Sequence, residues 1–291
     1  MSGQVSLPLT RKDKKRRLPH RNVVKLVRAL DGQKFVRWAN RISKLYKRGV
    51  KFSHDPASGR YQASDAFGSH FFAYPARLWS VWDGLAYRGK QIGHEYLLDA
   101  ISFKEGDTIV DVGANTGDLS LYFKVLGIKP ALICFEPAPK EFSALSANLA
   151  RADHVLSYQA HQLALWSEAN EGLTFYLDGN NGDNSLLAFK KPVETVTVPA
   201  ARLDEVLERR SYKLLKLEAE GAEPEILSGA SGVLDCFEFI TVDVGFERGV
   251  TAESTLPQVV NILLGHGFET IGYNGARHTL LFRSVTRKDY K

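Results

Sequence analysis

The chain has 291 residues, of which 44% are hydrophobic and 24% are charged, as is ordinary for globular proteins. No apolar run approaches the ~20 residues that a membrane span needs, and the N-terminus lacks an apolar signal segment. Cys134 and Cys236 form no disulfide framework, which suits a reducing cytoplasm. Composition therefore argues against a membrane-spanning, exported or disulfide-stapled protein.

Positive charge is concentrated at the N-terminus. The net charge of the whole chain is +5, but residues 1–51 hold 16 Lys and Arg against two acids. That arm carries +14, so the remaining residues carry −9. Such an arm could contact nucleic acid, an anionic membrane surface or an acidic glycan.

The first 95 residues divide into a tail and an extension. Residues 1–21 combine like charges with few apolar residues and predict a disordered basic tail. In the extension, 22–95, apolar residues recur at helical spacing over 23–30 and 35–45, with a break at Asp31-Gly32. These basic amphipathic helices could lie on a membrane, but we favour packing of their apolar faces on the catalytic domain.

Residues 50–95 are rich in glycine and aromatic residues. We expect short strands and turns there, leading to a helix near 93–100. This segment could form a lid or a wall of a substrate site, or it could serve packing alone. Both interpretations stay open.

Residues 96–291 alternate strand and helix signals, which predicts an α/β domain with a mostly parallel sheet and helices on both faces. Asn274-Gly275 separates the last two strand signals and indicates an antiparallel hairpin. The predicted fold is a Rossmann-like class I methyltransferase domain with seven strands. The strand signals are TIVDV, ALICF, VLSYQA, LLKLEA, FITVDV, FETIGYN and HTLLFR. Helices are expected near 117–126, 139–150, 202–209, 223–234 and 254–266.

The sharpest local motif is DTIVDVGANTG at 107–117, where a strand leads through a glycine turn into a helix. Glycine allows a ligand to approach the backbone closely, and the helix start offers N–H groups to a carboxylate. The dinucleotide spacing GxGxxG fails, because 115 is Asn and 118 is Asp. The spacing DxGxxxG suits S-adenosylmethionine instead. The predicted cofactor contacts here are Asp111, Gly113, Ala114, Asn115, Thr116 and Gly117.

A second motif, FEP, places Glu136 and Pro137 at the end of the next strand. A carboxylate there can accept hydrogen bonds from both ribose hydroxyls, and ligands of open α/β sheets bind outside the carboxyl ends of strands. After the third strand, Ala164 is expected to line the adenine pocket, and Gln162 to bond the edge of the base.

With these motifs, the chain resembles the FkbM-type methyltransferases. DTIVDVGANTG, FEP, GDNSLL, VPAARLDEVL and KLEAEGAEPEILSGA occur in the family's order, over roughly 88–283. The resemblance implies O-methylation of hydroxyls on sugars, polyketides and related natural products. It also implies that Asn184 and Ser185 lie near the active site. Many family copies have Asp where this chain has Glu218.

Methyl transfer to an alcohol needs an in-line acceptor and a base for its proton. Glu218 and Glu220 follow one strand, while Asp243 and Glu247 follow the next, so they are expected near the crevice mouth with Arg248. We predict Glu218 or Asp243 as the base, Glu220 as a further catalytic candidate, and Glu247 and Arg248 as substrate contacts. No HExxH motif or close histidine pair supports zinc. The clustered carboxylates could hold magnesium, but no metal site is predicted.

The leading hypothesis is O-methylation of a sugar hydroxyl in a glycan, glycolipid or natural product, by a cytoplasmic protein. Its basic N-terminal helices would then suit an anionic surface such as the inner membrane face. One alternative is an RNA methyltransferase whose arm binds phosphates. The acidic body and the lack of an RNA-binding motif argue against it. Another is a non-catalytic S-adenosylmethionine-binding module. The acceptor is expected to be a small molecule or glycan.

Overall fold

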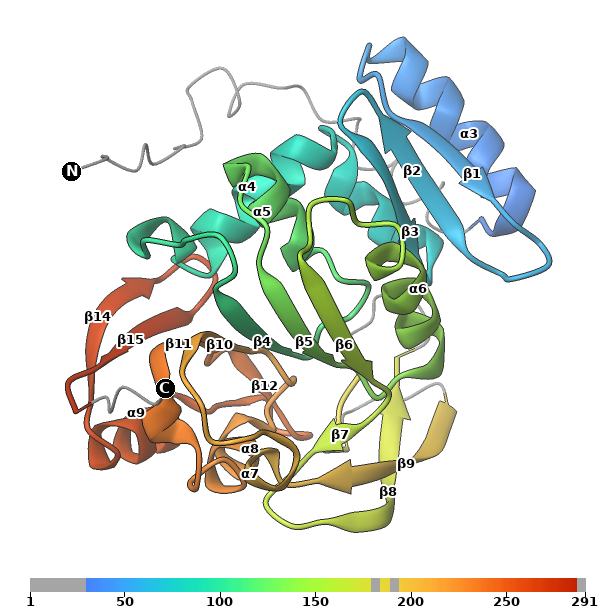
Figure 1. Ribbon diagram of the computed structural model, residues 1–291. Coiled ribbons are helices and arrows are strands. Elements are labelled where there is room, and N and C mark those ends of the chain that lie inside the picture. The colour runs from blue at the N-terminus through green and yellow to red at the C-terminus, as the bar shows by residue number, and fades with distance from the viewer. Residues whose placement is uncertain (1–29, 179–183, 189–193, 287–291) are drawn as a thin grey trace.

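The computed structural model describes residues 30–178, 184–188 and 194–286 (Figure 1). Its main sheet has seven strands in the order β14-β15-β11-β10-β4-β5-β6. The five strands from β11 to β6 are parallel, and β15 is antiparallel to both of its neighbours. The predicted sheet and its C-terminal antiparallel hairpin are therefore confirmed. The strands are β4 (Thr108–Val112), β5 (Ala131–Phe135), β6 (Ser157–His161), β10 (Tyr212–Leu217), β11 (Phe237–Asp243), β14 (Phe268–Asn274) and β15 (Thr279–Ser284).

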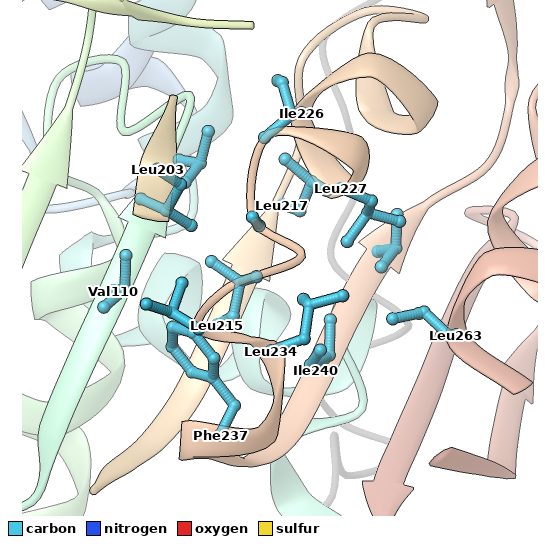
Figure 2. Packing of buried hydrophobic residues seen from close by; sticks show 14 of the residues in the cluster. Val110, Leu203, Leu215, Leu217, Ile226, Leu227, Leu234, Phe237, Ile240 and Leu263 are labelled. Atoms are coloured by element: carbon cyan, nitrogen blue, oxygen red, sulfur yellow. The ribbon is translucent and has the colours of Figure 1, made fainter. Parts of the chain in front are cut away.

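Helices cover both faces of this sheet because successive strand residues point to opposite sides. Val110, Leu215 and Ile240 pack with the helices of one face (Figure 2). Ile109, Leu214 and Phe239 pack on the other face. The first face carries α7 (Leu203–Val206), α8 (Glu223–Ser228) and α9 (Leu256–Gly265), and the second carries α4 (Leu85–Glu95), α5 (Leu119–Leu126) and α6 (Pro139–Leu149).

The N-terminal segment forms its own small layer, drawn in blue beside α6 (Figure 1). It consists of α3 (Gly32–Leu45), capped by the Asp31 side chain, and a three-stranded antiparallel sheet. The apolar face of α3 is buried, as favoured, but mainly against this sheet of the extension, whereas the prediction had it on the catalytic domain. The predicted helix at 23–30 and the tail at 1–21 lie outside the described residues. The strands are β1 (Lys51–His54), β2 (Tyr61–Asp65) and β3 (Gly68–Phe72).

The helix expected near 93–100 begins earlier, and this prediction is corrected. A 3-10 helix, η1 (Pro75–Val81), precedes α4, which starts at Leu85. The Leu85 N–H donates to the carboxylate of Asp65 at 2.8 Å, so a residue twenty positions upstream caps the helix. No local pattern could indicate this start. Only the short 3-10 helix η2 (Leu98–Ala100) occupies the end of the expected range.

A second small sheet between β6 and β10 was not predicted. Its order is β7-β9-β8, and it buries apolar residues beside the carboxyl ends of the main strands. The helices expected at 202–209 and 223–234 are shorter in the structure, and none of the described helices is long and apolar enough to cross a membrane. The remaining elements are β7 (Ala164–Leu165), β8 (Asn170–Leu177), β9 (Glu194–Ala201), η3 (Leu234–Cys236), β12 (Phe246–Arg248) and β13 (Glu253–Ser254).

Candidate cofactor and acceptor site

The turn after β4 is fixed by glycines in left-handed backbone. Gly113 has φ +70° and Gly117 has φ +83°. A Cβ added at Gly113 would overlap the carbonyl oxygen of Glu218, at the end of the neighbouring strand. The sequence interpretation held that glycine leaves room for a ligand. The structure gives a different reason at Gly113, which is the close approach of another strand end.

This geometry predicts that Gly113→Ala is strongly destabilising. Gly127 has nearly the same φ, +69°, but an added Cβ there would meet nothing within 4 Å. Gly127→Ala should therefore lower the free energy of unfolding by only about 1–2 kcal/mol, because a residue with a Cβ is strained in left-handed backbone. Gly113→Ala should lower it by about 1–3 kcal/mol more, because the added Cβ overpacks the site. Urea denaturation of both variants measures the difference, and equal midpoints would refute the steric account.

Glu136 follows β5 and is buried. One carboxylate oxygen accepts from the Asn115 N–H at 2.8 Å, and the other accepts from the Ala138 N–H at 2.8 Å. Burial, with the nearby charge of Glu141, raises the pKa of Glu136 to about 8. Each oxygen keeps a second lone pair, so the group can still accept hydrogen bonds from a ligand.

Two adjoining cavities open at the carboxyl ends of β4, β5 and β10. The space within them, open solvent at their mouths included, is about 700 Å³ in the larger and about 310 Å³ in the smaller. Both are lined by Arg77, Gly113, Asn115 and Glu218. The larger cavity has apolar walls from β7, β8 and α8, which suit an aromatic base. The smaller has charged walls, from Arg88, Asp111, Asp118, Lys216 and Glu218.

Most predicted cofactor residues line one or both cavities, but three do not. Thr116 is fully buried, donates to Asp118 and accepts from Asn148, so it supports the turn from behind. Gly117 also lies outside the lining. Gln162 is exposed, and Leu163 lines the larger cavity in its place, so the expected contact of Gln162 with the base is not supported. The predicted residues in the lining are Asp111, Gly113, Ala114, Asn115, Glu136, Pro137 and Ala164.

Glu218 is held between two cations. The Lys216 ammonium lies 3.1 Å from Glu218 and 3.1 Å from Asp111. The Arg277 guanidinium contacts Glu218 and lies 3.0 Å from Asp243. Burial alone would raise the pKa of Glu218, but these cations outweigh burial and hold that pKa well below its usual range. A carboxylate that resists protonation is a weak base, so the structure favours an ion-pair role for Glu218.

Asp243 and Glu247 have the opposite electrostatics. Burial and the Glu218 charge raise the pKa of Asp243 to about 6, although Arg277 opposes this. Burial, followed by the charges of Asp243 and Glu218, raises the pKa of Glu247 to about 7. Groups that titrate near neutral pH suit proton transfer. Asp243 and Glu247 are therefore better base candidates than Glu218.

Some of the other predicted residues line the larger cavity, and the rest lie outside its lining. Glu220 lines the larger cavity, and its carbonyl accepts from the Ser185 hydroxyl at 2.9 Å. Asn184 lines the same cavity and donates to Glu141. Ser185 lies outside the lining. Arg248 also lies outside it and pairs with Glu225 at 2.6 Å, which indicates a supporting role in place of the predicted substrate contact.

Sequence reasoning missed three residues that the fold brings to the site. Arg77 comes from η1, Tyr96 follows α4, and Arg277 lies in the turn between β14 and β15. Their sequence neighbours carry no motif. Asn274-Gly275 does predict the turn that presents Arg277, since Asn274 accepts from the Ala276 N–H. Among the described residues, no group of three or more His, Cys, Asp or Glu is arranged to hold a metal ion.

Comparison with known proteins agrees with this geometry. Residues 111–270, more than half of the chain, match the family model for the methyltransferase FkbM domain. The chain is 31% identical over 162 residues to Methyltransferase 1 of Beauveria bassiana (strain ARSEF 2860), covering 48% of this chain and 65% of that protein, just under two thirds. It is 29% identical over 213 residues to 31-O-demethyl-FK506 methyltransferase FkbM of Streptomyces tacrolimicus, covering 60% and 78%.

Among solved structures, magnesium protoporphyrin IX methyltransferase (ChlM) from Synechocystis PCC 6803 with bound SAH has a TM-score of 0.42 and 9% identity, over 70% of this chain and 85% of that one. The fold assignment rests on the sheet itself. A mostly parallel sheet that ends in an antiparallel pair, with its ligand turn after β4, is the class I methyltransferase arrangement. The chain belongs to the FkbM family of S-adenosylmethionine-dependent methyltransferases.

Proposed function

We propose that this chain transfers the methyl group of S-adenosylmethionine to a hydroxyl oxygen. The observation that carries the proposal is the buried Glu136 carboxylate, which lines the larger cavity beside the Gly113 turn. Glu136 would accept hydrogen bonds from the ribose hydroxyls, and the apolar walls would hold the adenine. The Asn115 Oδ1 atom is buried without a hydrogen-bond partner among the described residues, which suits a donor on the cofactor.

When bound, S-adenosylmethionine supplies an electrophilic methyl group. The acceptor oxygen would form a bond to that carbon as the carbon–sulfur bond broke, and the hydroxyl proton would go to a carboxylate. Asp243 or Glu247 would take this proton, since both have pKa values raised toward neutrality. Glu218, Lys216 and Arg277 would hold the cluster in place through their ion pairs.

The acceptor we propose is a sugar hydroxyl of a glycan, glycolipid or natural product. Carboxylates at the cluster can accept hydrogen bonds from several hydroxyls. Beside them lies an aromatic rim, defined as Phe246, Tyr273 and His278. Phe246 is 62% exposed and Tyr273 52% exposed, and each contacts His278. Exposed aromatic side chains commonly mark binding surfaces. A relative named for O-methylation of FK506 supports a small-molecule acceptor.

A methyl-transfer screen tests this proposal. The purified chain is incubated with radiolabelled S-adenosylmethionine and, separately, with oligosaccharides, glycolipids, macrolides and RNA. We expect label in a sugar-containing acceptor, linked as a methyl ether that survives mild alkali. Label in RNA alone would favour the nucleic-acid alternative. Tight cofactor binding with no transfer to any acceptor would favour a non-catalytic module.

We also propose that the N-terminal helix contacts an anionic membrane surface, as a cytoplasmic peripheral protein would. The outer face of α3 exposes Trp38 (49%) and Leu45 (76%) among several Lys and Arg residues. Apolar side chains within a basic helix face suit a lipid headgroup layer. Binding should require phosphatidylglycerol in phosphatidylcholine vesicles and should weaken with salt.

Vesicle co-sedimentation of the full chain measures this binding. Trp38→Ser with Leu45→Ser should reduce binding several-fold. Leu264→Ser, at a comparably exposed apolar position on α9, should leave it unchanged. Equal binding by all three chains would remove α3 from the membrane contact.

A further inference from the structure

Arg77 is the charged residue that the N-terminal segment adds to the lining of both cavities. It lies in η1, outside the region 111–270 that matches the family model. The two cavities share only four lining residues among those described, and Arg77 is the only cation of the four. We propose that Arg77 binds the carboxylate of the amino-acid part of the cofactor, an inference that rests on the proposed function.

The charge balance of the smaller cavity supports this role. Besides Arg77, its lining holds two cations, Arg88 and Lys216, and three acids. Arg88 is bonded to Asp118 at 3.1 Å and to Glu95 at 3.0 Å. Lys216 lies between Asp111 and Glu218, as described above. Counted with Arg77, three cations balance the three acids of this lining, whereas without Arg77 it is net negative and would repel a ligand carboxylate.

The surroundings of Arg77 suit a ligand that carries both charges. Its guanidinium acts electrostatically on Asp118 and on Glu141. Asp111, Asp118 and Glu218 in the same lining can attract the cofactor's ammonium group, while Arg77 attracts its carboxylate. An arginine can hold a carboxylate through two parallel hydrogen bonds. Asn115 also lines both cavities, and its buried Oδ1 atom can accept a hydrogen bond from the cofactor.

The fold holds η1 firmly against the cofactor turn. Leu78 and Val81 of η1 are buried with Leu121 of α5 in the N-terminal core. The Asn148 side chain bonds the backbone of Phe71 in β3 and the carbonyl of Thr116 in the turn. These contacts place Arg77 at the cavities without a closing motion. The described part of the extension, 30–95, is thus both a packing layer and, through Arg77, part of the cofactor site.

Isothermal calorimetry with two ligands tests the inference without an acceptor. S-adenosylhomocysteine carries the amino-acid part, and 5′-methylthioadenosine carries the same nucleoside without it. We expect Arg77→Met to weaken S-adenosylhomocysteine binding at least tenfold and to leave methylthioadenosine binding within about twofold. Arg77→Lys should lie between, since it keeps the charge and loses the paired geometry.

Arg60→Met is the matched control, because Arg60 is also N-terminal and half-buried but lines neither cavity. It should bind both ligands as the original chain does. Equal weakening of both ligands by Arg77→Met, or no weakening of either, would overturn the inference. If the unaltered, folded chain bound neither ligand, the proposed function itself would fall and this inference with it.

Discussion

Glu136→Gln is expected to weaken S-adenosylhomocysteine binding by roughly a hundredfold. The amide keeps the shape of the side chain but loses the charge that two ribose hydroxyls would share. A hydrogen bond to a charged group contributes about 1.5–3 kcal/mol, so losing two costs at least about 3 kcal/mol. Calorimetry on the purified variant measures this directly. Glu238→Gln is the matched control, since Glu238 is a half-buried, ion-paired carboxylate outside the lining of both cavities.

The raised pKa of Glu136 adds a pH signature. Below about 8 the unbound carboxyl is protonated, and it must release its proton before it can accept from both hydroxyls. Cofactor affinity should therefore rise as pH increases toward 8, and binding should release protons, so the heat measured should depend on the ionisation enthalpy of the buffer. Glu136→Gln should flatten this dependence. Unchanged affinity and an unchanged pH profile in the variant would remove Glu136 from the cofactor site.

Asp243→Asn should reduce turnover by roughly 10²–10⁴-fold, the usual contribution of general-base catalysis. S-adenosylhomocysteine binding should stay unchanged, because Asp243 lines neither cofactor cavity. The rate of the unaltered enzyme should rise with pH as the base loses its proton, with a midpoint near 6 if Asp243 is the base. If Glu247 is the base, the midpoint should lie near 7.

Glu247→Gln separates these two candidates, and Glu218→Gln is the comparison. Because Glu218 is paired with Lys216 and Arg277, removing its charge should lower stability, and because that charge raises the pKa of both candidate bases, it should also move the pH midpoint downward. These rates are measured with the acceptor from the methyl-transfer screen. Near-normal turnover in both Asp243→Asn and Glu247→Gln would exclude a carboxylate base from this cluster.

Local sequence patterns predicted those parts of the site that are formed by residues close together in the sequence. Strand alternation and the glycine spacing predicted β4, its turn and α5, and the FEP motif placed Glu136 at the end of β5. These features are encoded within a few residues, because each strand leads directly into its functional turn. The order of strand and helix signals likewise predicted the sheet and its antiparallel end.

The rest of the site depends on contacts between distant segments. Arg77 reaches the cavities only because η1 packs on α5, and Arg277 reaches Glu218 from the β14–β15 turn. Glu218 is a weak base because it is paired with Lys216 and Arg277. Its position at the end of a strand predicted a base, since the sequence does not show that these cations lie beside it. The β7-β9-β8 sheet was missed because no strand signal was assigned between VLSYQA and LLKLEA.

The most direct test of the central claim is a crystal structure of the chain with S-adenosylhomocysteine. Both ribose hydroxyls should lie within hydrogen-bond distance, about 3.2 Å or less, of the Glu136 carboxylate, with the adenine in the larger cavity. A nucleoside bound elsewhere, or a cavity that stays filled by side chains at saturating ligand, would contradict it.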